Sequence, residues 1–151
     1  MTEIIEPGSS ISDDAMKLLE SFIGVTLPRE YYLFLSHNGG GYPEPDSFRF
    51  MDNEDGSSVQ RFYGLNRSDT YDFVRNLNLY RGRIPEGFIA IACDPGGNQI
   101  CLGIKGEGRG KVYFWDHELE KCDGAKPDDS NMTLVSRNFS DFLNALYELN
   151  L

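Results

Sequence analysis

The sequence predicts a single domain of the α+β class, built around a mainly antiparallel sheet. Helical and strand-like segments follow the order helix, helix, strands, helix, strands, helix, without the regular alternation that typifies parallel sheets. Two apolar runs at residues 88–93 and 99–104 flank the turn D-P-G-G-N at residues 94–98, which is typical of an antiparallel hairpin. The 151 residues contain no internal repeat or linker, so we expect one domain over residues 1–151, with its core at roughly 12–151.

The first helix is predicted after an irregular lead-in over residues 1–11. Ser12 is a suitable N-cap, and the aspartates that follow it suit the positive end of the helix dipole. Gly24 ends the segment, because glycine readily adopts the left-handed conformation of a helix C-cap. The apolar residues between these caps recur at helical spacing and predict the buried face: Ala15, Leu18, Leu19, Phe22 and Ile23.

The second helix is predicted in the stretch LPREYYLFLSHNGGG, at residues 27–41. Pro28 occupies the first helical position that proline favours. Apolar and aromatic side chains then cover much of the helix. The sequence N-G-G at residues 38–40 supplies residues that tolerate a positive φ, as a left-handed cap requires. We therefore interpret the glycines as a helix stop that allows a sharp turn and close packing of neighbouring segments.

A strand–turn–strand unit and a third helix are predicted next. Phe48 and Phe50 alternate on one side of an acidic turn that contains Gly56, and a second alternation covers residues 59–63 on the other side. Ser68 is the predicted N-cap of the third helix. Its apolar positions are Tyr71, Phe73, Val74, Leu77 and Tyr80.

The C-terminal half continues with the predicted hairpin and a third consecutive strand. A glycine-rich turn at residues 106–110 leads into this strand, at residues 111–117. Residues 121–131 are polar and predict a loop. The last helix is predicted to be capped by Asn138 or Ser140. Its apolar residues are Phe139, Phe142, Leu143, Leu146 and Leu149.

The charge of the chain limits the classes of partner. There are 24 acidic and 14 basic side chains, which gives a formal net charge of −10. Nucleic-acid binding requires the opposite sign, so we expect no nucleic-acid partner. The same negative field would attract a basic protein and speed its encounter, although solubility alone is an equally simple reason for an acidic composition.

Cysteine use and hydropathy indicate a cytoplasmic protein with reduced thiols. Cys93, Cys101 and Cys122 make an odd number without a disulfide-framework spacing. Cys93 and Cys101 lie on either side of the hairpin turn, and the sequence leaves open whether they are neighbours. The first residues lack the basic and apolar regions of a secretory signal, and the longest apolar run, FIAIAC, is too short to cross a bilayer. We therefore expect no membrane association.

The sequence predicts no metal and no cofactor. The two histidines, His37 and His117, are not paired with Cys or His at a ligand spacing. The stretch MDNEDG is similar to part of a calcium-binding loop, but Met51 and Phe62 occupy the positions where Asp and Glu are required. The glycine-rich segment at residues 106–110 lacks the Lys-Ser/Thr pair of a phosphate-binding loop.

His117, beside Asp116, is the best candidate for a catalytic group. Nucleophilic catalysis also requires a nucleophile, which a cysteine of the hairpin strands would have to supply. A histidine at a strand end, held by local hydrogen bonds, is the simpler interpretation because nothing else completes a site. On the preceding strand, Tyr113 and Trp115 share one face, and that face is a candidate contact patch if it is exposed.

Three segments, in a fixed order, carry a resemblance to a known family. The first is LPREYYLFLSHNGGG, in which Leu-Pro, an aromatic residue, an apolar pair and Asn-Gly-Gly follow one another. The second is IPEGFIAIACDPGGNQICLGIKGEGRGKVYFWDHE, with a D-x-G-G-N type turn between two strands and a V-Y-x-W-x-H type ending. The third is the helical segment NFSDFLNAL. Together they cover most of the chain from Leu27 to Leu146 and resemble the SUKH superfamily of the SMI/KNR type.

The resemblance implies an α+β fold with a curved antiparallel sheet and helices packed against it. It offers no catalytic residue and implies a mainly architectural role for the motif residues. These are Leu27, Pro28, Tyr31, Asn38, Gly39, Gly40, Gly97, Asn98, Trp115 and His117. Most bacterial members look like immunity proteins, which bind and neutralise a toxin delivered by a neighbouring cell. Others are regulatory interaction proteins, including one tied to fungal cell-wall synthesis.

The leading hypothesis is a non-catalytic immunity protein, a monomer or weak dimer, that binds a basic toxin domain. That toxin, for example a nuclease, would belong to a bacterial polymorphic or contact-dependent toxin system. One alternative is a regulatory scaffold without a toxin partner, and another is a small enzyme centred on His117. Turns and strand ends that favour exposure supply the predicted contacts: Asp52, Glu54, Asp55, Tyr113, Trp115, Asp116, His117 and Glu118.

Overall fold

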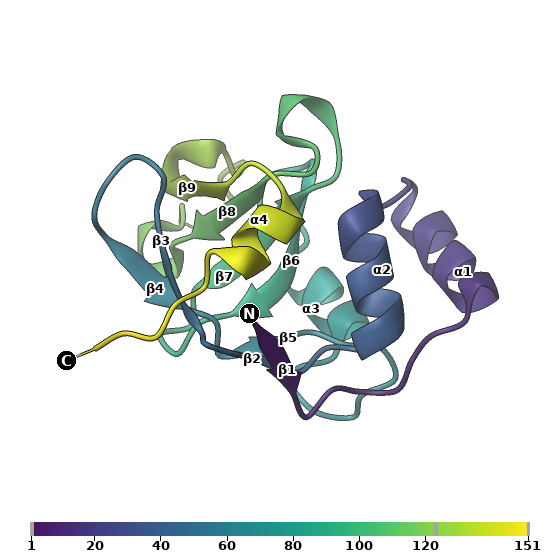
Figure 1. Cartoon of the computed structure of the whole chain (residues 1–151). Helices are drawn as coiled ribbons and strands as arrows, with labels where there is room; N and C mark the ends of the chain where they lie inside the picture. Colours follow the sequence, from purple (N-terminus) through teal and green to yellow (C-terminus); the bar gives the residue numbers. More distant parts are fainter. Residues whose placement is uncertain (1, 123, 151) are drawn as a thin grey trace.

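The computed structural model describes residues 2–122 and 124–150, and Figure 1 shows how the helices and strands are arranged. The helices are α1 (Asp13–Ile23), α2 (Arg29–Asn38), α3 (Phe73–Leu79) and α4 (Phe139–Asn144). The strands are β1 (Glu3–Ile5), β2 (Tyr42–Glu44), β3 (Ser47–Arg49), β4 (Gly56–Ser58), β5 (Arg61–Phe62), β6 (Phe88–Cys93), β7 (Gln99–Gly103), β8 (Val112–Trp115) and β9 (Met132–Ser136). Short 3₁₀ turns are η1 (Gly106–Gly108), η2 (His117–Leu119) and η3 (Asp129–Asn131). In this part of the chain, every helix is too short or too polar to span a bilayer.

The central sheet is antiparallel and has the strand order β5-β6-β7-β8-β9, in which each strand pairs with the next along the chain. Register shifts between Ala90 and Ala92, and between Val112 and Tyr113, mark irregularities of the bulge type, which bend strands. Two smaller antiparallel pairs, β1-β2 and β3-β4, complete the strands. The predicted α+β class, with a mainly antiparallel sheet and helices packed against it, is confirmed.

Both faces of the central sheet are covered. Phe114 of β8 packs against Phe48 with ring centroids 6.2 Å apart. Trp115, the next residue, points to the opposite face, where its ring meets Tyr80 edge-on at 5.6 Å, just after α3. The aromatic cluster on the Phe114 face also contains Phe50 after β3, Phe62 of β5, and residues of α2 and α4, which are Tyr31, Phe34, Phe139 and Phe142. Thus α4 and α3 lie on opposite sides of the sheet (Figure 1).

The predicted ends of the first two helices are confirmed. Ser12 Oγ accepts a hydrogen bond from the main-chain N of Ala15 at 3.2 Å. Gly24 and Gly39 adopt the left-handed conformation that ends α1 and α2. Pro28 is the N-cap of α2 rather than its first helical residue.

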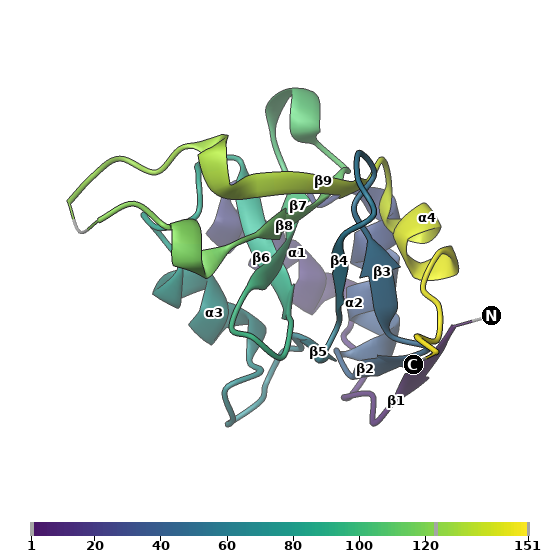
Figure 2. The ribbon, with the colours of Figure 1, turned by 90° about the vertical axis from the view of Figure 1, so that its left-hand side faces the viewer.

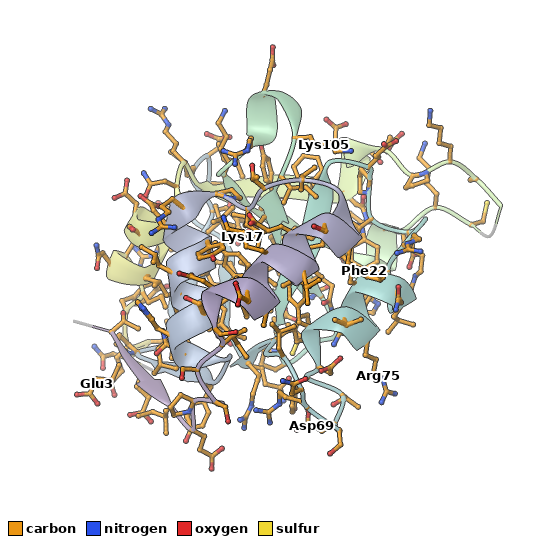
Figure 3. All side chains as sticks on the ribbon, turned by 90° about the vertical axis from the view of Figure 1, so that its right-hand side faces the viewer. Glu3, Lys17, Phe22, Asp69, Arg75 and Lys105 are labelled. Carbon is orange, nitrogen blue, oxygen red and sulfur yellow. The ribbon has the colours of Figure 1, made fainter. Side chains whose placement is uncertain are left out.

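The buried face of α1 differs from the predicted one. Its buried residues are Met16, Leu19 and Glu20. By contrast, Leu18 is 73% exposed and Phe22 is 56% exposed. Met16 and Leu19 join the core on this side of the helix, and the Glu20 carboxylate beside them accepts a hydrogen bond from the main-chain N of Leu27 at 2.6 Å, which ties the same side to the connection to α2. Because α1 lies at the edge of the molecule, only part of its apolar surface is covered (Figure 3).

Several local predictions are corrected by contacts that are distant in sequence. The lead-in at residues 1–11 contains β1, which pairs with β2. The N-cap of α3 is Asp72 rather than Ser68, because Asp72 accepts a hydrogen bond from a main-chain N of the first turn at 2.9 Å. The second strand of the predicted strand–turn–strand unit is β4 rather than the alternation at residues 59–63, whose strand β5 pairs with β6 in the central sheet. Residues 132–136, which carried no strand prediction, form its edge strand β9.

The last helix begins where one of the two predicted caps places it. Asn138 Oδ1 accepts a hydrogen bond from the main-chain N of Asp141 at 2.8 Å. Asn138 is therefore the N-cap of α4, and Ser140 lies inside the helix.

The turn after α2 is a junction of main chains. Gly39, Gly40 and Gly41 all have a positive φ. A Cβ on Gly40 would lie 2.8 Å from the main-chain O of Phe62 and 2.9 Å from the main-chain N of Gly64, closer than real side chains approach a backbone. The main-chain N of Phe62 donates to the O of Gly41 at 2.7 Å, which links β5 to the chain entering β2. The glycines therefore end the helix and also allow close packing, as predicted.

Replacing Gly40 with alanine is expected to lower the free energy of unfolding by about 3 kcal/mol, because the methyl group adds backbone strain and a collision with the β5 segment. Gly24→Ala is the matched control, since Gly24 also has a positive φ but no atom within 4 Å of an added Cβ. We expect a loss of only about 1 kcal/mol there. Urea unfolding followed by circular dichroism measures both losses, and equal values would contradict a packing role for Gly40.

Cys93 and Cys101 are not partners across the β6–β7 hairpin. Cys93 lies opposite Gln99, and Cys101 lies opposite Ala90. The three cysteines are free thiols: Cys101 is buried, Cys93 is partly buried and Cys122 is exposed. Burial raises the pKa of the Cys93 and Cys101 thiols, which keeps both protonated and poorly reactive near neutral pH.

A thiol titration of the folded protein checks this order of burial. At about pH 8 we expect Cys122 to react first with Ellman's reagent, Cys93 to react slowly, and Cys101 to react only after unfolding. Guanidinium should make all three equally reactive. Cys122→Ser should remove the fast phase, and a fast phase that persists in this variant would mean that a hairpin thiol is accessible.

Candidate partner-binding surface

The turn between β6 and β7 is held by one buried carboxylate. Asp94 is buried and accepts hydrogen bonds from the main-chain N of Gly96 at 2.9 Å and the main-chain N of Asn98 at 2.8 Å. Nδ2 of Asn98 donates to it at 3.0 Å, and Oγ of Ser57 on β4 donates at 2.8 Å. These four hydrogen bonds offset the cost of burying the carboxylate and tie β4 to the hairpin turn.

The same turn positions the end of β8. Oδ1 of Asn98 accepts a hydrogen bond from the main-chain N of His117 at 3.0 Å. Beyond β8, the main-chain N of Asp116 donates to the O of Asn131 at 3.0 Å, and Nδ2 of Asn131 donates to the O of Asp116 at 2.9 Å. The motif residues Asn98 and His117 thus connect two turns, which is an architectural role of the kind that the family resemblance implies.

His117 itself is half-buried, and its ring lies beside Gly97, where an added Cβ would be 3.6 Å from Nε2. The enzyme hypothesis requires a polar cleft that brings this ring to a nucleophile. Among the residues that the structure describes, no cysteine is hydrogen-bonded to His117. The same residues contain no group of three His, Cys, Asp or Glu side chains placed to hold a metal ion. The geometry at His117 is that of a packed strand end.

Trp115 is fully buried, which corrects its place among the predicted contact residues. The guanidinium of Arg83 lies 5.8 Å from the Trp115 ring centroid and 4.8 Å from that of Tyr80. Arg83 also donates to both carboxylate oxygens of Glu120, at 2.8 and 3.0 Å. Tyr80, Arg83 and Glu120 thus cover the Trp115 ring. The sequence could not predict this burial, because alternation along a strand indicates which side chains share a face but not which residues lie over that face.

Tyr113 shares the face of Trp115 but is only half-buried. Its ring packs edge-on against Phe88 with centroids 5.1 Å apart. Burial, together with the negative charge of Asp129, raises the pKa of the Tyr113 hydroxyl. Across the sheet its neighbour is Leu134 of β9, which is also half-buried. Tyr113 therefore stays accessible to a partner at this edge of the sheet.

The acidic turn between β3 and β4 is exposed and is anchored on the edge of the sheet. Its carboxylates are those of Asp52, Glu54 and Asp55. Asn53 Oδ1 accepts a hydrogen bond from the main-chain N of Asp55 at 2.8 Å, which shapes the turn. The main-chain N of Met51 donates to the O of Leu134 at 3.0 Å, so the turn begins against β9.

A second acidic group lies at the other end of β9. Asp116 and Glu118 follow β8, whose last residue, Trp115, pairs with Met132 at the start of β9. Figure 2 shows the β3–β4 turn at one end of β9 and the segment with η2 and η3 at the other. Within residues 2–122 and 124–150, no basic side chain forms an ion pair with any of the five carboxylates of these two groups.

We call this region the β9 surface. It comprises the carboxylates of Asp52, Glu54, Asp55, Asp116 and Glu118 and the accessible apolar side chains of Met51, Tyr113, Leu119, Met132 and Leu134. Among these, Met51 is 44% exposed and Leu119 is 64% exposed. The sequence prediction missed the apolar part except for Tyr113. The alternation M-T-L-V-S at residues 132–136 is the signal that could have revealed an edge strand.

The model of the SMI1 / KNR4 family (SUKH-1) matches residues 10–145, which include both motif turns and the central sheet. The chain is also 30% identical, over 154 residues, to the "SPbeta prophage-derived uncharacterized protein YokK" of Bacillus subtilis (strain 168), with 91% of this chain and 75% of that protein covered. The chain therefore belongs to the SMI1/KNR4 family (SUKH-1).

Proposed function

We propose that the chain is a non-catalytic immunity protein, which covers a basic surface of a toxin domain and so excludes the toxin's substrate. The β9 surface is the observation that carries this proposal. In the described part of the chain, its five carboxylates have no ion-pair partner, and accessible apolar side chains lie next to them. A partner with a basic rim around an apolar centre would complement both features.

The two kinds of side chain would serve different steps of binding. Together with the formal net charge of −10, the unpaired carboxylates would attract a basic partner and speed its encounter. Met51, Leu119 and Leu134 would then supply the short-range contacts that slow dissociation. Membership of the SMI1/KNR4 family supports a binding role, and the motif turns around Gly40 and Asp94 serve packing.

A nuclease toxin is the class of partner that this charge pattern suits best. A nuclease must hold phosphates, so its active surface carries cations that are free in the absence of substrate. Exposed carboxylates on the β9 surface would occupy those cations and compete with the nucleic-acid backbone. Binding of this kind requires no reaction at His117 and no cofactor.

Charge reversal of the acidic turn tests the proposal. In the triple variant Asp52→Lys, Glu54→Lys and Asp55→Lys, association with the cognate toxin domain should slow by about tenfold or more at low salt. Cells that produce the toxin with this variant should lose protection. Stopped-flow or surface-plasmon-resonance kinetics measure the association rate, and growth during co-expression measures protection.

The control must change the net charge equally at another place. Glu44, Glu107 and Glu148 are exposed and lie outside both the β9 surface and the other pockets, so their replacement by lysine makes the matched variant. Its association rate should fall only by the part that depends on the net charge of the whole chain, and it should still protect cells that produce the toxin. Equal losses in the two variants would argue against the β9 surface, and unchanged killing with the wild-type chain would reject the immunity role itself.

A further inference from the structure

A groove of about 480 Å³, open to solvent, lies between the end of α1, α3 and the start of β6. Its lining is mainly apolar and includes Leu77 of α3, together with Ile84, Phe88 and Ile104. Phe22 of α1 forms one wall, and Figure 3 shows this residue beside α3 with Lys105 above it. Pockets that bind ligands or side chains of partners commonly enclose about 300–1,000 Å³.

The helices that border the groove leave further apolar side chains uncovered. Leu18 precedes Phe22 by one turn on the same side of α1, and both are more than half exposed. Leu79 of α3 is 52% exposed. Single exposed apolar side chains are ordinary, but several around one apolar groove mark a surface that a partner covers.

The charged residues of the groove have the opposite sign to the chain. Arg81, Lys105 and Lys126 line it, against one carboxylate, that of Glu86. The whole chain, by contrast, has 14 basic and 24 acidic side chains. Among the residues that the structure describes, none of the three cations forms an ion pair. The groove therefore offers unpaired positive charge directly beside apolar surface.

From this geometry we propose that the groove binds an acidic, amphipathic helical segment of a protein partner. The apolar side chains of such a segment, spaced at three and four residues, would fill the groove and contact Phe22. Its carboxylates would reach Arg81, Lys105 and Lys126. This partner differs in chemistry from the basic toxin domain proposed for the β9 surface, and the two surfaces adjoin where Phe88 of the groove packs against Tyr113.

The cations make the choice of partner selective. A basic amphipathic helix would bring like charges against three cations, and the repulsion would grow as the apolar contact excludes water. An uncharged helix would gain apolar contact but leave the cations without partners. Of these three kinds of helix, the acidic one complements both the apolar lining of the groove and its three cations.

A pair of model peptides tests the proposal. The probe is a fluorescein-labelled peptide of about 16 residues, with leucine at helical spacing and glutamate at most other positions; its twin has lysine in place of each glutamate. In fluorescence anisotropy at low salt, the glutamate peptide should bind saturably and the lysine peptide should not. Amide shifts in ¹H–¹⁵N spectra should map the bound glutamate peptide to Leu77, Ile84 and Ile104.

Variants of the groove separate the charged and apolar contributions. The double variant Lys105→Glu and Lys126→Glu should weaken binding of the glutamate peptide by about tenfold, and Phe22→Ser should weaken it without altering its dependence on salt. The control is the double variant Arg75→Glu and Arg137→Glu, which makes the same charge change at exposed positions outside the groove. It should bind nearly as wild type, and circular dichroism verifies that every variant is folded.

Three results would overturn the proposal. They are equal binding of the two peptides, equal losses in the groove variant and its control, and shifts that map to the β9 surface instead of the groove. None of them bears on toxin protection, which depends on the β9 surface, so the two proposals fail independently.

Discussion

Close contact between main chains at residues 39–41 is the constraint on which the rest of the structure depends. A side chain at Gly40 would collide with the backbone of the β5 segment, and Gly41 is hydrogen-bonded to Phe62 of β5. The lead-in to α1 is fixed nearby, where the main-chain N of Ile11 donates to the O of Ser36 at 2.7 Å. The turn therefore holds the β1–β2 pair, α2 and the first strand of the central sheet in one arrangement, which the aromatic cluster then fills.

Hydrogen bonds of Asp94 connect the core to the surface segments. Its carboxylate joins Ser57 of β4 to the hairpin turn, and Asn98 of that turn accepts a hydrogen bond from the main-chain N of His117 at the end of β8. Buried and multiply hydrogen-bonded polar groups tolerate few alternative geometries. The acidic segments at the two ends of β9 are thus carried by well-fixed elements, and four of their five acidic residues are exposed, Asp116 being half-buried. A surface of this kind loses little conformational freedom in its backbone when it meets a partner.

Local chemistry made the fold class and many element ends predictable from the sequence. Ser12, Gly24 and Gly39 act through their own conformations or through hydrogen bonds within a few residues, and the D-P-G-G-N turn specifies its hairpin in the same way. Contacts between distant segments were not predictable. The strand β1 exists because of β2, and Trp115 is buried because the Tyr80 segment lies over it.

The candidate surfaces follow the same division. The acidic turn was predictable, because charged residues around Gly56 favour an exposed connection, and Asp52, Glu54 and Asp55 are indeed exposed. The groove was not, since the spacing of Leu18 and Phe22 predicts a buried face, whereas in the structure α1 buries Met16, Leu19 and Glu20 and leaves Leu18 and Phe22 exposed. A helical pattern identifies an apolar stripe, and the tertiary structure decides whether the chain itself or a partner covers it.

The two surfaces can coexist because charge acts over different distances. At physiological salt the Debye length is about 8 Å, so a partner far from the chain experiences mainly the excess of negative charge, weakened by screening. At contact, the charges that lie within about 8 Å of the partner decide whether it is attracted or repelled. A basic partner is favoured both at long range and at the β9 surface, whereas an acidic segment must approach against the net charge before Arg81, Lys105 and Lys126 attract it. Association at the groove should therefore be slower than association at the β9 surface. Added salt screens the net charge, so it should slow association of the basic partner and speed association of the acidic segment.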